Sequence, residues 1–264
     1  MSAKIEAIGG MSEMHKGSLC RLLPWDTEFF GCRIASICGD SLNEEQALQI
    51  DVWSRSHHIQ CLYFLARMDD PATIQTAGKH GFGLADIRVT LDYVMHNSNQ
   101  PARPDASAGI NIRPFQADDL VGLQSMARTG HTDTRFFKDS HFSREHAEEL
   151  YSTWIARDTE GRAQIVWVAA SMANEPLGYI SCHVDSARQE GRIGLVGVSS
   201  QARRRGIGKS LVLTALGWFK TQGVNKVMVV TQGNNLAAQR LYQQCGFLSR
   251  DLQIWYHKWY PTVD

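Results

Sequence analysis

The sequence predicts an α/β protein of the α+β type, in which helices flank a mixed, mostly antiparallel and twisted sheet. Two observations indicate this class. Several short segments rich in β-branched residues follow one another through turns of hairpin length, as antiparallel strands do. Segments with apolar residues at helical spacing lie between the other strands and can cover the faces of a sheet. Of the 264 residues, 43% are hydrophobic and 20% are charged, which is ordinary for a globular chain of one or two domains.

The first elements after residue 109 are a strand, two helices and three more strands. A strand is expected over residues 110–115, and a helix with an acidic first turn over 118–127. A second helix is expected over 144–156, where five apolar residues share one face. Three strands then follow over 164–170, 178–184 and 191–198, separated by the turn segments NEP and SARQEG.

The chain ends in two helix–strand pairs. A helix is expected from about residue 206 to 220, with a buried apolar stripe, and a β-branched strand follows over 226–231. A further helix over 235–245 and a final strand over 251–259 complete the series.

One segment breaks the chain into two parts. Residues 96–109, HNSNQPARPDASAG, are poor in large apolar residues and rich in Asn, Ser, Pro, Ala and Gly, which is typical of a linker. We therefore expect a loose N-terminus over 1–18, an N-terminal domain over 19–96, a linker over 97–109 and a C-terminal domain over 110–264.

Charge and composition exclude several classes of protein. The 27 basic and 27 acidic residues balance, which argues against coating nucleic acid or an anionic membrane. No apolar run approaches the roughly 18 residues of a membrane span, and the N-terminus lacks the apolar core of a secretory signal. The six cysteines are scattered, and His57, His58 and Cys61 are too few ligands for a zinc site. We expect a cytoplasmic protein without a metal.

A short pattern occurs twice. Residues 77–82, AGKHGF, and residues 241–247, LYQQCGF, each end an expected helix with Gly-Phe before an alternating strand. In both, the glycine can take the left-handed conformation while Phe folds back onto the core. The echo indicates either a duplicated half-domain or a connection that recurs in many folds.

The segment 191–211, GRIGLVGVSSQARRRGIGKSL, has the features of an anion site. A strand ends at Val198, a basic loop follows, and Gly206 and Gly208 open a helix whose first N–H groups suit phosphate. Arg203 occupies the position where a Walker A loop needs glycine, and Leu211 the position of the third glycine of a dinucleotide fingerprint. The alternative without a ligand is a solvated basic loop before an ordinary helix.

Two motifs resemble one family. Arg203-x-x-Gly206-x-Gly208, followed by Asn235-x-x-Ala238-x-x-x-Tyr242-x-x-x-Gly246-Phe247, resembles the signatures of the GCN5-related N-acetyltransferase (GNAT) superfamily. The resemblance covers about residues 110–259. It implies the fold of that superfamily, with acetyl-CoA as co-substrate and a strand over 193–198 that pairs with the pantetheine arm.

The resemblance also implies a set of site residues. Tyr242 would donate a proton to the leaving thiolate, although an aromatic residue at helical spacing is also simply a core residue. Asn235 is expected both to cap its helix and to contact the pantetheine. N–H groups near Gly197 and Val198 are candidates for the oxyanion contact. The expected cofactor-binding residues are Val196, Gly197, Val198, Arg203, Arg204, Arg205, Gly206, Ile207, Gly208, Lys209, Ser210 and Asn235.

The N-terminal part carries a finer resemblance. Residues 23–31, LPWDTEFFG, and 134–139, TRFFKD, look like segments of the N-acetyltransferases of TDP-4-amino-4,6-dideoxygalactose (TDP-fucosamine). There a truncated, degenerate copy of the fold precedes the working one; here Ala77 stands at the position of Tyr242, so this copy should be inert. The resemblance implies that Asp86 holds the acceptor amine, and Arg135 and Phe136 the substrate; a surface charge at a strand start is the alternative for Asp86.

The sequence thus predicts an N-acetyltransferase that moves an acetyl group from acetyl-CoA to the primary amine of a nucleotide-linked amino-deoxy sugar. A different small amine, an antibiotic or a protein N-terminus is the alternative acceptor. A non-catalytic acyl-CoA sensor is the alternative of another class. A homodimer is a family-level expectation.

Overall fold

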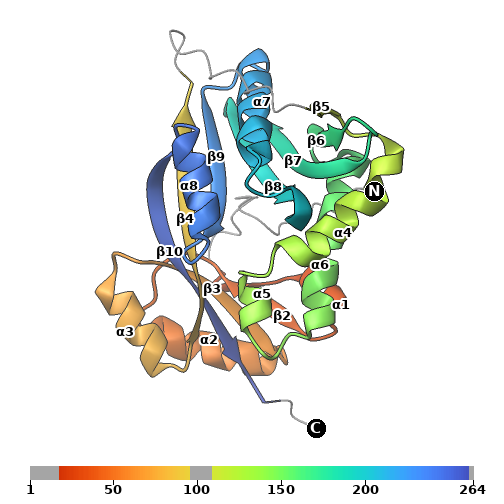
Figure 1. Cartoon of the computed structure of the whole chain (residues 1–264). Coiled ribbons are helices and arrows are strands. Elements are labelled where there is room, and N and C mark those ends of the chain that lie inside the picture. Colours follow the sequence, from red (N-terminus) through yellow and green to blue (C-terminus); the bar gives the residue numbers. More distant parts are fainter. Residues whose placement is uncertain (1–17, 96–108, 262–264) are drawn as a thin grey trace. The chain divides into compact units, whose positions relative to one another are not determined.

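The computed structural model describes residues 18–95 and 109–261, and they form two compact units (Figure 1). Unit 1 contains the described residues up to Ile87 together with those from Leu252 onward, and unit 2 runs from Arg88 to Asp251. The N-terminus expected to be loose, up to residue 17, and most of the expected linker lie outside the described residues. Over the part of the chain that the structure describes, none of the helices has the length and apolar character needed to cross a bilayer.

Unit 1 has a four-stranded sheet in the order β1-β2-β3-β10. The β2 and β3 strands pair in parallel, whereas β1 with β2 and β3 with β10 are antiparallel. Its elements are β1 (Cys20–Leu22), α1 (Pro24–Phe30), β2 (Ile34–Ile37), α2 (Glu44–Ser56), β3 (Cys61–Arg67), α3 (Pro71–Lys79), the first residues of β4 (Gly83–Val94) and the last residues of β10 (Leu248–Trp259).

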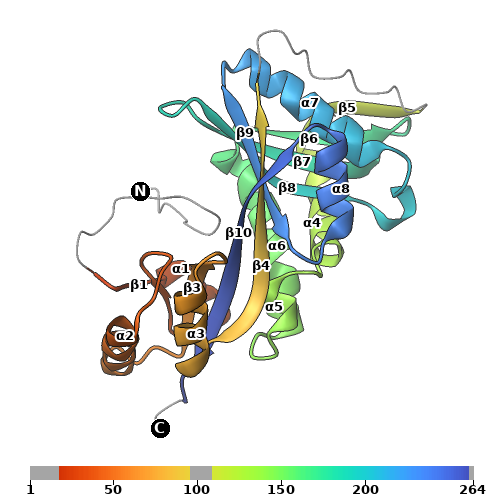
Figure 2. The ribbon, with the colours of Figure 1, turned by 90° about the vertical axis from the view of Figure 1, so that its left-hand side faces the viewer.

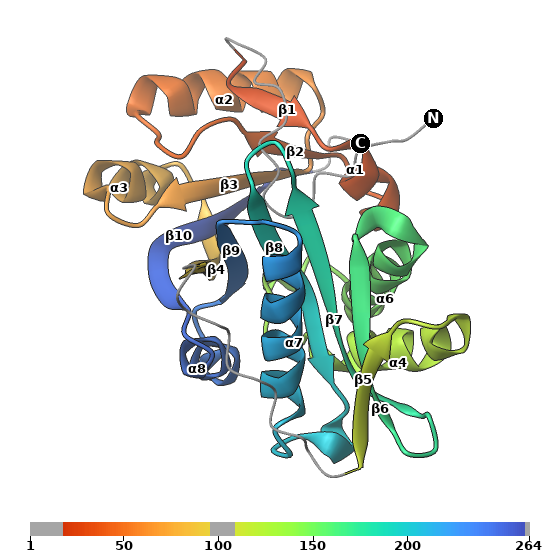
Figure 3. The same ribbon diagram turned by 90° about the horizontal axis from the view of Figure 1, so that it is seen from above.

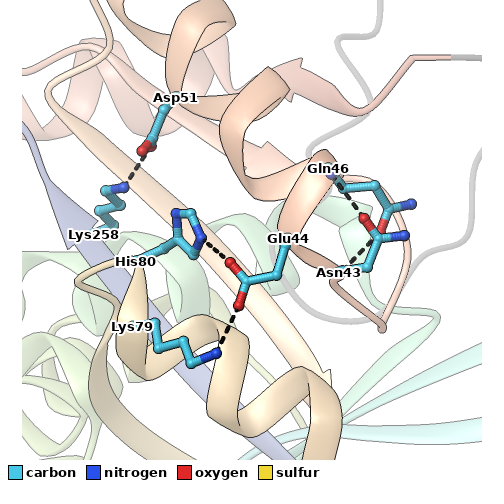
Figure 4. A network of polar contacts seen from close by, with 7 residues as sticks. All are labelled: Asn43, Glu44, Gln46, Asp51, Lys79, His80 and Lys258. Carbon is cyan, nitrogen blue, oxygen red and sulfur yellow. Dashed lines mark hydrogen bonds and ion pairs between the residues drawn. The ribbon is translucent and has the colours of Figure 1, made fainter.

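Polar side chains tie the helices of unit 1 together (Figure 4). Asn43 caps α2 in a capping box with Gln46. Glu44, in the first turn of α2, accepts from Lys79 and contacts the His80 ring at the end of α3. Lys258 of β10 donates to Asp51 of α2, so the last strand of the chain is anchored to a helix near its beginning.

Unit 2 has the six-stranded order β4-β9-β8-β7-β6-β5. All neighbours are antiparallel except β8 and β9, which are parallel. Its further elements are β5 (Ile110–Pro114), α4 (Leu120–Gly130), α5 (Arg135–Lys138), α6 (Arg144–Arg157), β6 (Ile165–Ser171), β7 (Pro176–Asp185), β8 (Glu190–Val198), α7 (Ile207–Thr221), β9 (Lys226–Gln232) and α8 (Leu236–Gln244). Short turns of helix cover Ala117–Asp119, Asp158–Arg162 and Ser200–Ala202.

Helices cover both faces of the unit 2 sheet, α7 on one side and α4 with α6 on the other (Figure 3). Gly191 shows how closely α7 packs, because a Cβ built there would lie 2.6 Å from the Phe219 ring. The predicted fold class, a mixed sheet flanked by helices, is confirmed. The helices and strands expected after residue 109 are all found, with ends that differ by a few residues.

The repeated Gly-Phe pattern belongs to a longer repeat. The series β9-α8-β10 copies β3-α3-β4, and each member starts 165 residues after its counterpart (61 and 226, 71 and 236, 83 and 248). The helix ends agree in detail: the Phe82 N–H donates to the Ala77 carbonyl, and the Phe247 N–H donates to the Tyr242 carbonyl, both at 3.0 Å. Gly81 and Gly246 have φ of +76° and +90°. Three elements of equal length and spacing favour a duplicated half-domain over a recurrent connection.

The two copies exchange their last strands. The β4 strand of the first copy pairs with β9 of the second, with Arg88 opposite Gln232, and β10 of the second pairs with β3 of the first, with Gln253 opposite Arg67. Figure 2 shows β4 and β10 as the two longest strands. The compact units therefore divide within these strands and not at the expected linker. The composition of a polar segment does not indicate which partner a strand chooses.

Candidate functional site

The β8 strand separates from β9 halfway along its length. The parallel pairing with β9 covers only Glu190 to Ile193, while pairing with β7 continues to Val198. The separation begins at an irregularity opposite Ser181, whose Oγ accepts the Leu195 N–H at 2.8 Å. A bulge of this kind ends regular pairing and re-aims the strand.

The separated part of β8 offers backbone N–H groups along one edge. The Ser199 N–H donates to the Leu177 carbonyl at 2.9 Å, so alternation also directs the Gly197 N–H toward β7. Val196 and Val198 then direct theirs to the other edge, which has no partner strand among residues 18–95 and 109–261. Of the two residues expected near the oxyanion, only Val198 presents its N–H there.

The basic loop after β8 has an unusual backbone. Arg204 and Gly206 have φ of +61° and +77°, and Gly206 is the residue before the first turn of α7. The Ser210 N–H already bonds the Gly206 carbonyl, so the N–H groups of Ile207 and Gly208, in the first turn, are ones that α7 leaves for a ligand. These N–H groups and the helix dipole favour an anion.

The side chains of this loop and of the first turn of α7 differ in exposure. Those of Arg203, Arg204 and Arg205 are exposed, and Arg203 Nε reaches the Val198 carbonyl at 3.4 Å. Ile207 and Ser210 are buried, with exposed fractions of 1% and 5%, so any part they play in binding goes through their backbone. Lys209 is half-buried.

The α8 helix meets the start of α7 and the end of β8 at Gly208. A Cβ built on Gly208 would lie 3.2 Å from Leu241 Cδ2 and 3.9 Å from Val198 Cγ2. Asn235 caps α8, its Oδ1 accepting the Ala238 N–H at 3.1 Å, as expected. The two motifs of the sequence are thus brought together in space.

Tyr242 lies on α8 next to Leu241 and is 5% exposed. Its ring centroid is 5.8 Å from that of Phe247. Burial raises the pKa of the Tyr242 hydroxyl, so this phenol carries its proton at neutral pH. It is therefore a core aromatic residue, and a protonated phenol as well.

The other expected site residues lie elsewhere. Asp86 belongs to unit 1 and is 5% exposed, so it is not a surface charge; its Oδ1 accepts the Ile87 N–H at 2.9 Å. Arg135 and Phe136 form α5 in unit 2. The Phe136 ring is 4% exposed, and the Arg135 guanidinium lies over it at 4.4 Å, which leaves little of the ring for a ligand.

A histidine–tyrosine pair behind β8 is not apparent from the sequence. A Cβ built on Gly197 would be 2.5 Å from the Tyr179 ring, and the Tyr179 hydroxyl is 3.0 Å from His131 Nε2. The His131 ring stacks on Tyr151 at 4.7 Å. Burial lowers the pKa of His131 to about 4, so this imidazole is neutral at physiological pH. These residues come from α6, β7 and the segment after α4, and no local motif links them.

No cluster of three His, Cys, Asp or Glu side chains suited to a metal ion occurs within the described ranges.

Comparison with known proteins gives a family match for part of the chain. Residues 130–247 match the family described as "Acetyltransferase (GNAT) family". The chain is similar in fold to a GCN5-related N-acetyltransferase from Sphaerobacter thermophilus, with a TM-score of 0.65, 17% identity, and coverage of 93% of this chain and 78% of that one. Residues 130–247 are therefore an acetyltransferase domain of the GNAT family, whose members use acetyl-CoA, and the chain has the fold of a solved GCN5-related N-acetyltransferase.

Curated relatives include two kinds of acetyltransferase and a polysaccharide biosynthesis protein. The dTDP-fucosamine acetyltransferase of Escherichia coli O6:H1 is 26% identical over 89% of this chain and 96% of its own length. The mycothiol acetyltransferase of Thermobispora bispora is 26% identical over 73% of this chain, and the spore coat polysaccharide biosynthesis protein SpsD of Bacillus subtilis is 29% identical over 56%. The chain spans 64% and 50% of the lengths of these last two relatives.

Proposed function

We propose that this protein is an N-acetyltransferase that moves the acetyl group of acetyl-CoA to a primary amine by direct attack on the thioester. The observation that carries the proposal is the separation of β8 from β9 beside the glycine-opened start of α7. This arrangement combines an unpaired strand edge with an anion-binding helix end, and acetyl-CoA has an extended amide arm joined to a diphosphate.

The cofactor follows from these two features. Its diphosphate would accept hydrogen bonds from the N–H groups of Ile207 and Gly208, with Arg203–Arg205 and Lys209 adding positive charge. Its pantetheine arm would pair with the Val196 and Val198 edge of β8 as an added strand, with Asn235 as a further contact. A backbone N–H of this open edge that the pantetheine arm does not use would stabilise the oxyanion that forms when the amine attacks the carbonyl carbon.

Tyr242 is the proposed proton donor to the leaving thiolate. Its raised pKa keeps the proton on the phenol, but also makes the phenol a weak acid toward a thiol with an ordinary pKa near 8.5. General-acid help of this kind is worth about 10²–10⁴-fold, and the weak acidity of Tyr242 favours the lower end.

The acceptor we propose is the amine of a nucleotide-linked amino-deoxy sugar. Support comes from the dTDP-fucosamine acetyltransferase, because this chain matches that relative over nearly all of its length. Asp86 is the proposed partner of the acceptor ammonium group. Arg135 is proposed to contact the substrate. The mycothiol acetyltransferases favour a second candidate, an amine on another small molecule.

The test is release of free CoA thiol from acetyl-CoA, measured with TDP-4-amino-4,6-dideoxyhexoses, with simple amines and polyamines, with peptide N-termini and without acceptor. We expect release that depends on the amino-sugar nucleotide. If the protein bound acetyl-CoA but released no thiol with any amine, it would be an acyl-CoA sensor and not an enzyme.

Tyr242→Phe should lower kcat about 10²-fold with little change in the KM for acetyl-CoA, because the ring stays in the core while the acidic proton is lost. Tyr256→Phe is the matched control, since it removes the hydroxyl of a buried tyrosine in unit 1. Equal, small effects of both variants would remove Tyr242 from the mechanism.

A further inference from the structure

The bulge in β8 is held by a side chain of the neighbouring strand. Ile180 of β7 is opposite Val196 and Cys182 is opposite Ile193, so Ser181 alone stands opposite both Gly194 and Leu195. Ser181 Oγ accepts the Leu195 N–H at 2.8 Å, where a regular ladder would use a backbone carbonyl. Both residues are buried, so water cannot take the place of the hydroxyl. The Ser181 side chain therefore satisfies the N–H group that the bulge takes out of the ladder.

Gly194 leaves the space in which this hydroxyl lies. A Cβ built on Gly194 would be 2.6 Å from Ser181 Oγ and 2.6 Å from His183 Nε2. Asp158 Oδ2 lies 3.6 Å from the same His183 nitrogen. Burial would raise the pKa of Asp158, but hydrogen bonding with His183 and with Ser181 lowers it, so the carboxylate beside these groups is charged. With Asp158 as acceptor for its hydrogen, the Ser181 hydroxyl keeps its lone pairs for the Leu195 N–H.

The bulge reverses the alternation of β8. Ile193 precedes it and Val196 and Val198 follow it, yet all three pack in the core that α7 covers. A regular strand would place residues three apart on opposite faces. Without the extra residue, the last part of β8 would be shifted by one position, and the N–H groups of Val196 and Val198 would point toward β7 and away from the open edge.

We propose that Ser181 is a positioning residue for the cofactor: it holds the bulge and so directs the N–H groups of Val196 and Val198 to the edge where the pantetheine arm would pair. This role rests on the proposed function, because it assigns the open edge to CoA. Ser181 would act through the strand and not by touching the cofactor. Its neighbours Ile180 and Cys182 lie in the α7 core, so its own side chain faces the other side of the sheet.

Two ligands separate the pantetheine arm from the diphosphate. CoA has both, whereas adenosine 3′-phosphate 5′-diphosphate, the nucleotide half of CoA, has no arm to pair with β8. By calorimetry, we expect Ser181→Ala to weaken CoA about tenfold, because two backbone hydrogen bonds to the arm are lost. The affinity for the nucleotide half should not change. Ser152→Ala is the matched control, since it removes the hydroxyl of a buried serine of α6, also in unit 2, and should bind both ligands as the unaltered protein does.

Gly194→Ala tests the same contact from the other strand. Its methyl group would displace the Ser181 hydroxyl and should weaken CoA as well. If both substitutions release one bulge, the variant that carries both should bind CoA about as strongly as the weaker of the two single variants. Effects that multiply would show that the two residues act separately, and would overturn the role of the bulge.

Amide hydrogen exchange follows the strand edge directly. CoA should protect the Val196 and Val198 N–H groups in the unaltered protein, and should not protect them in Ser181→Ala, at a temperature where thermal unfolding shows both proteins to be folded. Equal affinities of Ser181→Ala and Ser152→Ala for CoA would overturn the proposal. Equal losses of CoA and of the nucleotide half in Ser181→Ala would also overturn it, because a merely structural role weakens both.

The proposed function would fail in a different way. If the unaltered protein bound CoA but transferred no acetyl group, the role of Ser181 would still be measured, because calorimetry follows binding alone. Acetyl transfer by the unaltered protein with full CoA affinity in Ser181→Ala would remove Ser181 and leave the enzyme. No binding of CoA by the unaltered protein would overturn both.

Discussion

At the scale of single residues, His131 has the most unusual setting in unit 2. It is held between the Tyr151 ring and the Tyr179 hydroxyl, and burial lowers its pKa to about 4. Because the pKa in the folded chain lies below the usual value of about 6.5, protons bind the unfolded state more readily. The free energy that this neutral ring contributes is present above pH 6.5 and is lost as the pH falls toward 4.

We therefore expect the free energy of unfolding to fall by up to about 1.4 kcal/mol per pH unit between pH 6.5 and 4 on account of His131. Urea unfolding at pH 7, 6 and 5 measures this slope. His131→Phe keeps the stacking on Tyr151 but has no titrating group, so its slope should be smaller. The same slope in both proteins would show that His131 does not titrate as its burial implies.

Predictability at this scale depends on distance along the chain. The roles of the Arg203–Gly208 loop and of Asn235 could be predicted from the sequence, because each is a local motif whose backbone role follows from its residue types. His131 and Tyr179 are distant in the sequence and are brought together by the packing of α4 against β7. Neither residue of such a pair has a distinctive neighbourhood in the sequence. The burial of Phe136 was equally hidden, because it depends on packing against Phe142.

At the scale of elements, α3 and α8 are two copies of one helix. Asp70 caps the first by accepting the Thr73 N–H, and Asn235 caps the second by accepting the Ala238 N–H, both at 3.1 Å. The two caps should contribute similar free energies, about 1 kcal/mol each. Only the cap of α8 adjoins the proposed cofactor site.

Asn235→Ala and Asp70→Ala should therefore lower the free energy of unfolding by similar amounts, about 1 kcal/mol in urea titrations. In kinetic assays Asn235→Ala should also raise the KM for acetyl-CoA, whereas Asp70→Ala should leave it unchanged. An unchanged KM in both variants would leave Asn235 with the capping role alone.

The start of α7 allows a test of charge without strain. Gly206 has φ of +77°, so any side chain there strains the backbone whatever it does to a ligand. Gly208 has an ordinary φ, and a Cβ would press only on the flexible end of Leu241. Gly208→Ala should thus bind CoA within a few-fold of the unaltered protein, while Gly208→Asp should weaken CoA at least tenfold by placing a negative charge at the diphosphate. If calorimetry gave these two variants equal affinities for CoA, the diphosphate would not bind at Gly208.

At the scale of the whole molecule, the reciprocal strand exchange determines how the chain holds together. The β3 strand has its seven-residue pairing with β10, and β9 has its seven-residue pairing with β4, so each half of the chain completes the sheet of the other. The sequence echo indicated the duplication, since Gly81 and Gly246 repeat a helix ending. The exchange could not be predicted, because β4 and β10 are equivalent strands and each has the pattern to pair with either partner.

Two separate chains, residues 1–101 and 102–264, should consequently co-purify when expressed together and show one thermal transition. Each alone should be aggregated, because it leaves a seven-residue strand edge open. A tag on one chain and gel filtration of the captured material would test this. A folded monomer from either chain alone would show that its own last strand can fill the gap.

The anchoring of β10 to α2 through Lys258 and Asp51 has a consequence for biosynthesis. A ribosome delivers α2 and β3 well before β10, because the whole of unit 2 is encoded between them. Unit 2 receives β4 before β9 has been made, whereas β3 of unit 1 keeps a bare edge until unit 2 has been translated. The half that is translated first is therefore the half that matures last, and nascent chains stalled before residue 252 should be substrates for chaperones that shield such edges.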